Sequence, residues 1–186
     1  LVNSYSDKLP SVLSDNRKGA YLAGRYLIEH GHKTVALLAG VRSYLSNQER
    51  TAGFLQAFQE EGLSIPPELI LETGSWLYDA AEKVCLNFFN TYTGEMPTAL
   101  FAFNDRLATG AINAICKTGR TVPDDVSVIG YDNLGYYNII SPRITTVETH
   151  IEAISESTVM HMIWQLNNGS CLPVKVLTPV EVISGE

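Results

Sequence analysis

Residues 122–133 read VPDDVSVIGYDN, and this segment decides the fold of the chain. A Pro-Asp-Asp turn leads into a short run rich in β-branched residues, which passes through a glycine and closes on Asp132. Such a run is typical of a strand buried within a sheet. We therefore expect Asp132 at the carboxyl end of a buried strand, which is the edge where open α/β sheets bind their ligands.

An upstream segment, PTALFAFND at residues 97–105, repeats the pattern. Its apolar run predicts a second strand that closes on Asn104 and Asp105, and the residues from Leu107 to Cys116 then favour a helix. The carboxyl ends of parallel strands share one edge of a sheet, so polar residues at two such ends predict a binding site there.

Strand and helix patterns alternate along the rest of the chain. Further helices are expected at residues 16–30, 48–61, 78–89 and 151–166, and further strands at 1–5, 11–13, 34–39, 69–71, 144–147, 173–177 and 180–183. Alternation repeated at least four times favours right-handed parallel crossovers. The expected fold class is therefore α/β, with a doubly wound parallel sheet.

Length and charge exclude several classes of protein. The 186 residues suffice for one well-packed domain, and no apolar run approaches the ~20 residues that a bilayer requires. The net charge is −7 and the 13 Lys and Arg residues are scattered, so this chain is not expected to bind nucleic acid itself. The chain opens on Leu1 without a Met, a signal peptide or a basic arm, and we expect that its front is missing.

No catalytic or metal-binding motif is visible. The three cysteines lack CxxC spacing, and Cys85 and Cys116 fall in apolar helical stretches, which predicts buried thiols in a reducing compartment. His30 and His32 have no third metal ligand nearby in the sequence. The GxSxG elbow, the Walker loop and a GxGxxG motif after a strand are all missing. We expect a protein that is not an enzyme and that holds no metal or cofactor.

The two segments above, together with QERTAGF at residues 48–54, resemble the effector-binding core of the LacI/GalR family of bacterial transcription repressors. The resemblance reaches from Leu1 almost to Glu186. It implies a type I periplasmic-binding-protein-like fold, in which two α/β lobes joined by three crossover strands clamp an effector between them.

The resemblance also implies how the chain divides between those lobes. Residues 1–15 would be a remnant of the N-terminal lobe and its crossover, and residues 16–148 a nearly complete C-terminal lobe. Residues 149–176 would supply a helix and a strand of the N-terminal lobe, and residues 177–186 a final strand that returns to the C-terminal lobe. Most of the N-terminal lobe and the helix-turn-helix headpiece would then be missing from this chain.

Three polar residues are the main candidates for effector binding. Family members hold the effector with an arginine that matches Arg50, whose guanidinium offers fork-shaped donors to neighbouring ligand oxygens. The family residue that matches Asp132 also contacts the ligand, and Asn104 presents both a donor and an acceptor. Each has a structural alternative, which is a surface ion pair for Arg50 and a role in a turn for Asp132 and Asn104.

Two further candidates lie in predicted loops. Trp76 follows a strand and precedes a helix, where an indole could cover one face of a sugar or base, and the alternative is a core tryptophan. Ser46 matches a polar effector contact in some relatives. Sugar-responsive relatives often carry a carboxylate near the position of Ser4, so a sugar specificity does not transfer directly.

An apolar segment outside the core strands predicts an interface. Tyr136, Tyr137, Ile139 and Ile140 form it, and aromatic residues are favoured at interface centres. In the family the corresponding stretch meets its copy across a two-fold axis, which implies a homodimer. A local extension of the core is the alternative.

The resemblance implies the sensor portion of a cytoplasmic transcriptional regulator. Its partner would be a small effector, a sugar or a nucleobase-like molecule, and it would reach operator DNA only through the headpiece. The alternative is a periplasmic sugar-binding protein of a transport system, which shares the fold. A third interpretation, an α/β enzyme, lacks a base, a nucleophile and a phosphate loop.

Overall fold

A six-stranded sheet forms the body of the protein. The computed structural model describes residues 1–135, 143–169 and 172–185. The strands lie in the order β3 (Ile70–Glu72), β2 (Val35–Ala39), β4 (Ala99–Ala102), β5 (Ser127–Asp132), β6 (Thr145–Glu148) and β8 (Glu181–Ile183). Neighbouring strands are parallel except at the edge, where β8 runs antiparallel to β6.

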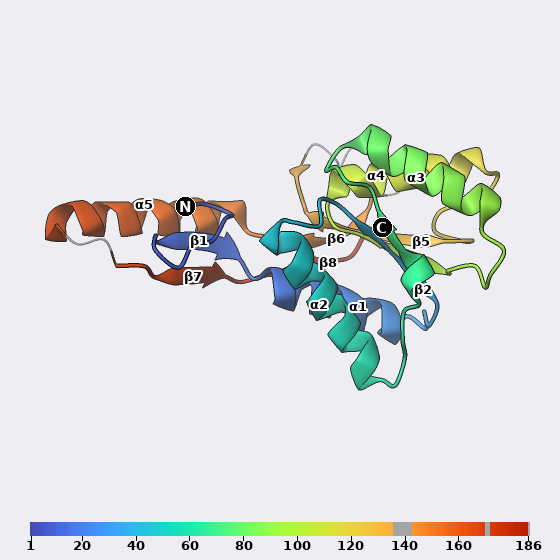
Figure 1. Ribbon diagram of the computed structural model, residues 1–186, viewed down its shortest axis with the longest axis horizontal. Helices are drawn as coiled ribbons and strands as arrows, with labels where there is room; N and C mark the ends of the chain where they lie inside the picture. Colours follow the sequence, from blue (N-terminus) through green and yellow to red (C-terminus); the bar gives the residue numbers. More distant parts are fainter. Residues whose placement is uncertain (136–142, 170–171, 186) are drawn as a thin grey trace.

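Helices cover both faces of this sheet (Figure 1). Helices α1 (Asn16–Glu29) and α2 (Leu45–Glu60) pack together on one face. Helices α3 (Tyr78–Thr91) and α4 (Asp105–Lys117) pack together on the other, and a short 3₁₀ turn (Pro67–Leu69) precedes β3. The expected doubly wound α/β architecture is confirmed.

The core lies between the sheet and its helices. Every residue of β2 and β4 is buried, as the continuous apolar runs predict for strands covered on both faces. The ring of Phe54 stacks on those of Phe58 and Phe101, with centroid distances of 5.0 and 4.9 Å. These rings join α2 to β4 in the core.

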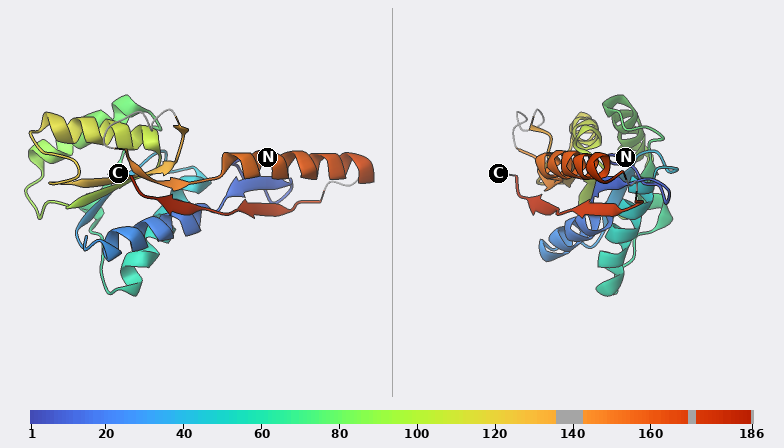
Figure 2. Two further views of the ribbon diagram at one scale, coloured as in Figure 1. Left: turned by 180° about the vertical axis from the view of Figure 1, so that it is seen from behind. Right: turned by 90° about the vertical axis from the view of Figure 1, so that its left-hand side faces the viewer.

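A second, smaller layer projects from the body as an arm. Strands β1 (Ser11–Ser14) and β7 (Lys175–Thr178) pair in parallel, and helix α5 (Ile151–Asn168) lies along them (Figures 1 and 2). The chain passes between the arm and the body at Asp15, between β6 and α5, and between β7 and β8. The carboxyl edge of the main sheet lies at this junction.

The arm leaves much of its apolar surface exposed. Ile154 is the buried residue of α5, whereas Met160 and Leu166 are 71% and 76% exposed. Trp164 is also exposed. A helix that is apolar around most of its circumference is usually buried. The described residues leave most of α5 exposed, which is unusual for a helix of this composition.

Three expectations about local structure are wrong. Residues 1–5 form no strand but only an isolated bridge from Val2 to Val12, because Asn3 adopts a left-handed φ of 49° that interrupts an extended chain. Helix α2 begins three residues earlier than expected, at Leu45. Cys116 is exposed because it lies on the solvent face of α4, whereas Cys85 is buried and burial raises its pKa to about 12.

Some expectations fall on residues outside the described part of the chain. The predicted interface residues Tyr136, Tyr137, Ile139 and Ile140 lie there, and so does Cys171. Within the described ranges, no helix combines the length and the apolar character needed to cross a membrane.

Candidate functional site

A cavity of about 200 Å³ lies at the carboxyl edge of the main sheet, next to the arm. All five predicted ligand-binding residues line it, namely Ser46, Arg50, Trp76, Asn104 and Asp132. The remaining lining residues are Asn3, Ser14, Asn16 and Thr149. The structure thus brings together residues from separate loops, strands and helices that are distant in the sequence.

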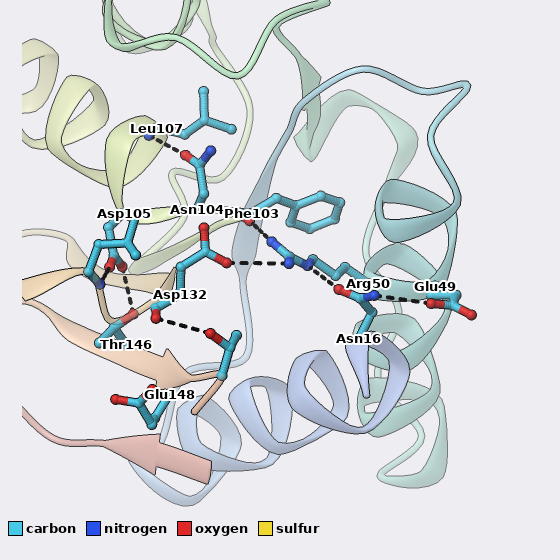
Figure 3. Close-up of polar contacts among 12 residues, drawn as sticks. Asn16, Glu49, Arg50, Phe103, Asn104, Asp105, Leu107, Asp132, Thr146 and Glu148 are labelled. Carbon is cyan, nitrogen blue, oxygen red and sulfur yellow. Dashed lines mark hydrogen bonds and ion pairs between the residues drawn. The ribbon is translucent and has the colours of Figure 1, made fainter. Parts of the chain in front are cut away.

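Arg50 is held rigidly at one wall of the cavity (Figure 3). It lies in the second turn of α2 and is 7% exposed. Its Nε donates to Asn16 Oδ1 at 2.9 Å, and Nη1 donates to the carbonyl oxygen of Phe103. The guanidinium carbon lies 3.5 Å from the centre of the Tyr131 ring. Arg50 is therefore a buried, positioned cation rather than a surface arginine.

Asp132 faces Arg50 from the end of β5. Its Oδ1 accepts a hydrogen bond from Arg50 Nη2 at 3.4 Å, and its side chain is 28% exposed. Burial raises the pKa of Asp132, while the Arg50 guanidinium opposes that shift. The backbone φ of 102° turns the chain sharply at this residue, and the Thr149 hydroxyl donates to the Asp132 carbonyl oxygen at 3.3 Å. The carboxylate retains acceptor capacity for a ligand.

Asn104 serves the fold and faces the cavity as well. It is the N-cap of α4, and its Oδ1 accepts from the Leu107 backbone N–H at 2.7 Å. Such capping satisfies a backbone donor that the helix leaves unpaired. Oδ1 already accepts one hydrogen bond, so the amide N–H groups are the main donors that Asn104 offers a ligand. The structural alternative and the binding role are compatible here.

Trp76 forms an aromatic wall of the cavity. Its half-buried ring lies against Gly40, where a Cβ would overlap the indole, so only glycine leaves room for the ring. Tyr44 approaches the indole edge-on, with ring centroids 6.0 Å apart and an interplanar angle of 80°. Thr73 holds the start of this loop by donating to the Ala39 carbonyl oxygen at 2.9 Å.

Ser46 lies in the first turn of α2 rather than in a loop. The N-cap of this helix, Tyr44, makes no side-chain capping bond. Ser46 therefore brings its hydroxyl to the cavity beside a helix terminus, where backbone N–H groups offer further donors.

Sequence reasoning missed Asn16 as a site residue. Asn16 is buried and links two charged groups, since Oδ1 accepts from Arg50 and Nδ2 donates to Glu49 Oε2 at 3.2 Å. Lys175 of β7 bonds the same Glu49 carboxylate at 3.2 Å. This chain of contacts runs from the cavity to the arm. The sequence signal, an Asn after a helix cap, is indistinguishable from that of an ordinary first-turn residue.

Asp105 lies behind the cavity rather than in it. It is 2% exposed, and its carboxylate accepts from the Thr146 hydroxyl at 2.6 Å and from the Leu134 backbone N–H at 3.0 Å. Burial raises its pKa to about 6. A Cβ at Gly130 would overlap this carboxylate, which explains the glycine in β5. Asp105 ties α4 to β6 and to the segment that follows Asp132.

The cavity suits an uncharged polar molecule. It presents one cation and one carboxylate that already pair, with amide and hydroxyl groups around them and an indole at one side. The described residues contain no group of three or more His, Cys, Asp or Glu side chains arranged to hold a metal ion. Such a lining supports hydrogen bonding and stacking.

Comparison with known proteins identifies the family to which this chain belongs. Residues 25–186 match the family model of the periplasmic binding protein-like domain. The HTH-type transcriptional repressor PurR of Aliivibrio fischeri (strain MJ11) is 36% identical over 154 residues, which cover 83% of this chain and 45% of that repressor. The chain thus spans somewhat less than half the length of this relative.

Solved structures agree closely in fold. A LacI family transcriptional regulator from Mycobacterium smegmatis superposes with a TM-score of 0.90 at 25% identity, covering 99% of this chain and 68% of that chain. The lac repressor dimer bound to operator superposes with a TM-score of 0.87 at 27% identity, covering 99% and 54%. Two of these relatives are repressors and the third is a LacI family transcriptional regulator, so the alternative of a periplasmic transport protein is not supported. The chain belongs to the periplasmic-binding-protein-like domain family and is the effector-binding core of a LacI-family regulator.

Proposed function

We propose that the cavity at the carboxyl edge binds the small-molecule effector of a LacI-type transcriptional regulator. The observation that carries this proposal is the convergence of Arg50, Trp76, Asn104 and Asp132 on one cavity, from elements on both faces of the sheet. Strands and helices hold Arg50, Asn104 and Asp132 before a ligand arrives, and packing against Gly40 places the Trp76 ring. Preorganisation of this kind reduces the entropy lost on binding.

The effector is an uncharged, polar molecule with a flat or ring-shaped body, such as a sugar or a nucleobase-like compound. Asp132 accepts hydrogen bonds from ligand hydroxyl or ring N–H groups, while Asn104 and Ser46 donate to ligand oxygens. Trp76 covers an apolar face of the ring. A charged ligand would pair with either Arg50 or Asp132 and leave the charge of the other without a partner. An unpaired charge is costly at a half-buried site.

The lobes divide as the family resemblance implies, with residues 16–148 as one lobe and residues 1–15 and 149–176 as part of the other, before residues 177–186 return. The exposed apolar side chains of the arm, including Met160 and Leu166, support a larger second lobe that covers them. Asn3 and Ser14 bring the arm to the cavity wall. A ligand therefore contacts both parts.

The effector controls operator affinity by favouring one arrangement of the two lobes. A ligand shifts such an equilibrium only by its differential affinity for the two arrangements. The contacts from Arg50 through Asn16 and Glu49 to Lys175 connect the cavity to the arm and could differ between arrangements. DNA contacts belong to a headpiece, since this acidic chain lacks clustered cations.

The regulator acts in the cytoplasm as a homodimer. The solved lac repressor structure, at 27% identity, is a dimer bound to operator. Tyr136, Tyr137, Ile139 and Ile140 are the proposed interface segment on the basis of their apolar and aromatic character.

A ligand screen tests the proposal. Thermal melting of the protein is followed with a panel of monosaccharides and purine bases, because a ligand at about one hundred times its Kd adds ~2.7 kcal/mol of stability. We expect at least one compound to raise the Tm. Calorimetry with Asp132→Asn then decides whether this cavity is the site, with Asp125→Asn in an exposed turn as the control. Unchanged affinity in Asp132→Asn would contradict the assignment.

A further inference from the structure

A second and larger cavity, of about 720 Å³, lies at the opposite edge of the sheet from the effector cavity. Its walls come from the amino ends of β5 and β6, at Ser127 and Thr145, and from the carboxyl ends of α1 and α4, at His30 and Cys116. This volume falls within the range of pockets that take small organic molecules. None of the residues assigned to effector binding lines it.

The charged groups in the described lining of this cavity are the two arginines Arg120 and Arg143, and that part of the lining includes no aspartate or glutamate. His30 and His32 line it as well, and burial lowers the pKa of His32, which favours its neutral form. In a chain whose net charge is −7, this local excess of basic groups creates a site that favours anions.

The two arginines retain donors for a ligand. Arg120 donates from Nη1 to the Thr118 hydroxyl at 2.9 Å, and its guanidinium lies 5.5 Å from the centre of the Phe89 ring. Among the described residues, no carboxylate lies within ion-pair distance of Arg120 or Arg143. The nearby Asp125 carboxylate is bound by the Thr121 backbone N–H and hydroxyl, each at 2.7 Å. These bonds lower its pKa, and the charge of Arg120 adds to that shift from beyond ion-pair distance.

The two histidines are fixed through one nitrogen each. His30 Nδ1 contacts the Tyr26 carbonyl oxygen at 2.7 Å, and the imidazole stacks on the Tyr26 ring at 4.1 Å. His32 Nδ1 contacts the Thr98 hydroxyl at 2.9 Å. Nε2 is then the nitrogen through which each ring can bond a ligand.

The rest of the lining is largely apolar. Leu27, Ile112, Val128, Ile129 and Ile144 contribute to it. Apolar lining with a few convergent polar groups is the usual composition of a site for an organic ligand. A bare inorganic anion would leave these side chains without a contact.

We propose that this second cavity binds an organic anion with an apolar body and a carboxylate or phosphate group. The acidic group accepts hydrogen bonds from Arg120 and Arg143, and the apolar body packs against Ile112, Val128 and Ile144. The site is independent of the effector cavity, so its existence does not depend on the proposed function.

The test uses benzoate and phenyl phosphate as probes, with benzyl alcohol and inorganic phosphate as controls that lack the charge or the ring. Two-dimensional ¹H–¹⁵N NMR of the protein follows each titration at low ionic strength. We expect benzoate and phenyl phosphate to shift the amide signals of Ile112, Val128 and Ile144, and the controls to bind at least several-fold more weakly. If inorganic phosphate bound with the same affinity as phenyl phosphate, the requirement for an apolar body would be overturned.

Matched variants locate the anion. In Arg120→Gln/Arg143→Gln, loss of two charge-assisted contacts should weaken benzoate binding by about tenfold or more. Arg17→Gln, which removes an arginine bonded to Gln56 elsewhere on the surface, should bind as the parent does. Retained affinity in the double variant, or shifts at the arm or effector cavity instead, would overturn the proposal. So would an absence of saturable binding up to about 10 mM probe in the parent protein, which needs no variant to fold.

Discussion

Arg50 and Asp132, which lie 82 positions apart in the sequence, face each other across the carboxyl edge of the sheet with Nη2 and Oδ1 3.4 Å apart. The contact is longer than a typical charge-assisted hydrogen bond. Each partner is held by its own element, Arg50 through Asn16 and Phe103, and Asp132 at the sharp end of β5. The pair is therefore preorganised, and both partners line the cavity in which a ligand would bind.

Removing the Arg50 side chain should destabilise the fold as well as weaken effector binding. Arg50→Ala leaves the Asn16 and Phe103 oxygens and the Asp132 carboxylate without their donor, and breaking a buried pair costs about 3 kcal/mol. Urea unfolding measures the change. Arg17→Ala, at an exposed arginine, should stay within about 0.5 kcal/mol of the parent. Equal small effects in both variants would show that the Arg50 contacts do not support the fold.

The buried Asp105 carboxyl should make the stability of the fold depend on pH. Its pKa rises from 3.8 to about 6 through burial, so the folded protein binds a proton more tightly than the unfolded chain. Its stabilising contribution is present below pH ~4 and is lost as the pH rises through ~6, a change on the order of 3 kcal/mol.

Asp105→Asn isolates this contribution. The amide oxygen can still accept from the Leu134 N–H, and the amide nitrogen can donate to the Thr146 hydroxyl, so the local bonds survive without a titrating group. We expect the free energy of unfolding of this variant, measured with urea, to fall less than that of the parent between pH 4 and 7. Asp125→Asn should retain the parent slope there, because hydrogen bonds from Thr121 lower the pKa of Asp125. Parallel curves for Asp105→Asn and the parent would contradict the assignment.

Gly130 should tolerate no side chain. A methyl group there would overlap the Asp105 carboxylate, which Thr146 and Leu134 hold in place, and overpacking of this kind costs about 1–3 kcal/mol. Thermal and urea unfolding of Gly130→Ala measure that loss. At Gly135 an added Cβ meets no described atom within 4 Å, so Gly135→Ala is the matched control. A Gly130→Ala protein as stable as this control would mean that the Asp105 position adjusts freely.

The two tryptophans allow a direct test of the aromatic wall. Trp76 lines the effector cavity, whereas Trp164 lies exposed on the arm. Effector binding should change the fluorescence of Trp76, and Trp76→Leu should abolish that signal and weaken affinity by about tenfold, because the stacking surface is lost. Trp164→Phe should preserve both the signal and the affinity. A signal that disappears with Trp164 instead would place the ligand against the arm.

The strand ends were predictable because local sequence determines them. An apolar run followed by Asp132, or by Asn104, must bring that residue to the sheet edge once the run is buried. Asn16, Ser14 and Thr149 were not predictable in the same way. They reach the cavity only through packing of α1 on α2 and through the path of the crossovers, and no local pattern encodes those relationships.

Other differences have equally specific causes. Cys116 follows the buried Ile115 on α4, but the next position of the helix faces solvent. The apolar composition of the segment does not show which side of the helix Cys116 occupies. The strand expected at residues 1–5 depended on β-type residues, but the left-handed Asn3 overrides that preference. The family resemblance assigns α5 to the N-terminal lobe, and its apolar residues are exposed because little of the described chain covers them.

If the proposed function is right, the effector lies in the carboxyl-edge cavity between Arg50, Trp76, Asn104 and Asp132. The decisive measurement is a crystal structure of the protein with a compound that raises its Tm. We expect the ligand within hydrogen-bonding distance of Arg50 and Asp132, with its ring against Trp76. Ligand density elsewhere, with this cavity holding only water, would contradict it.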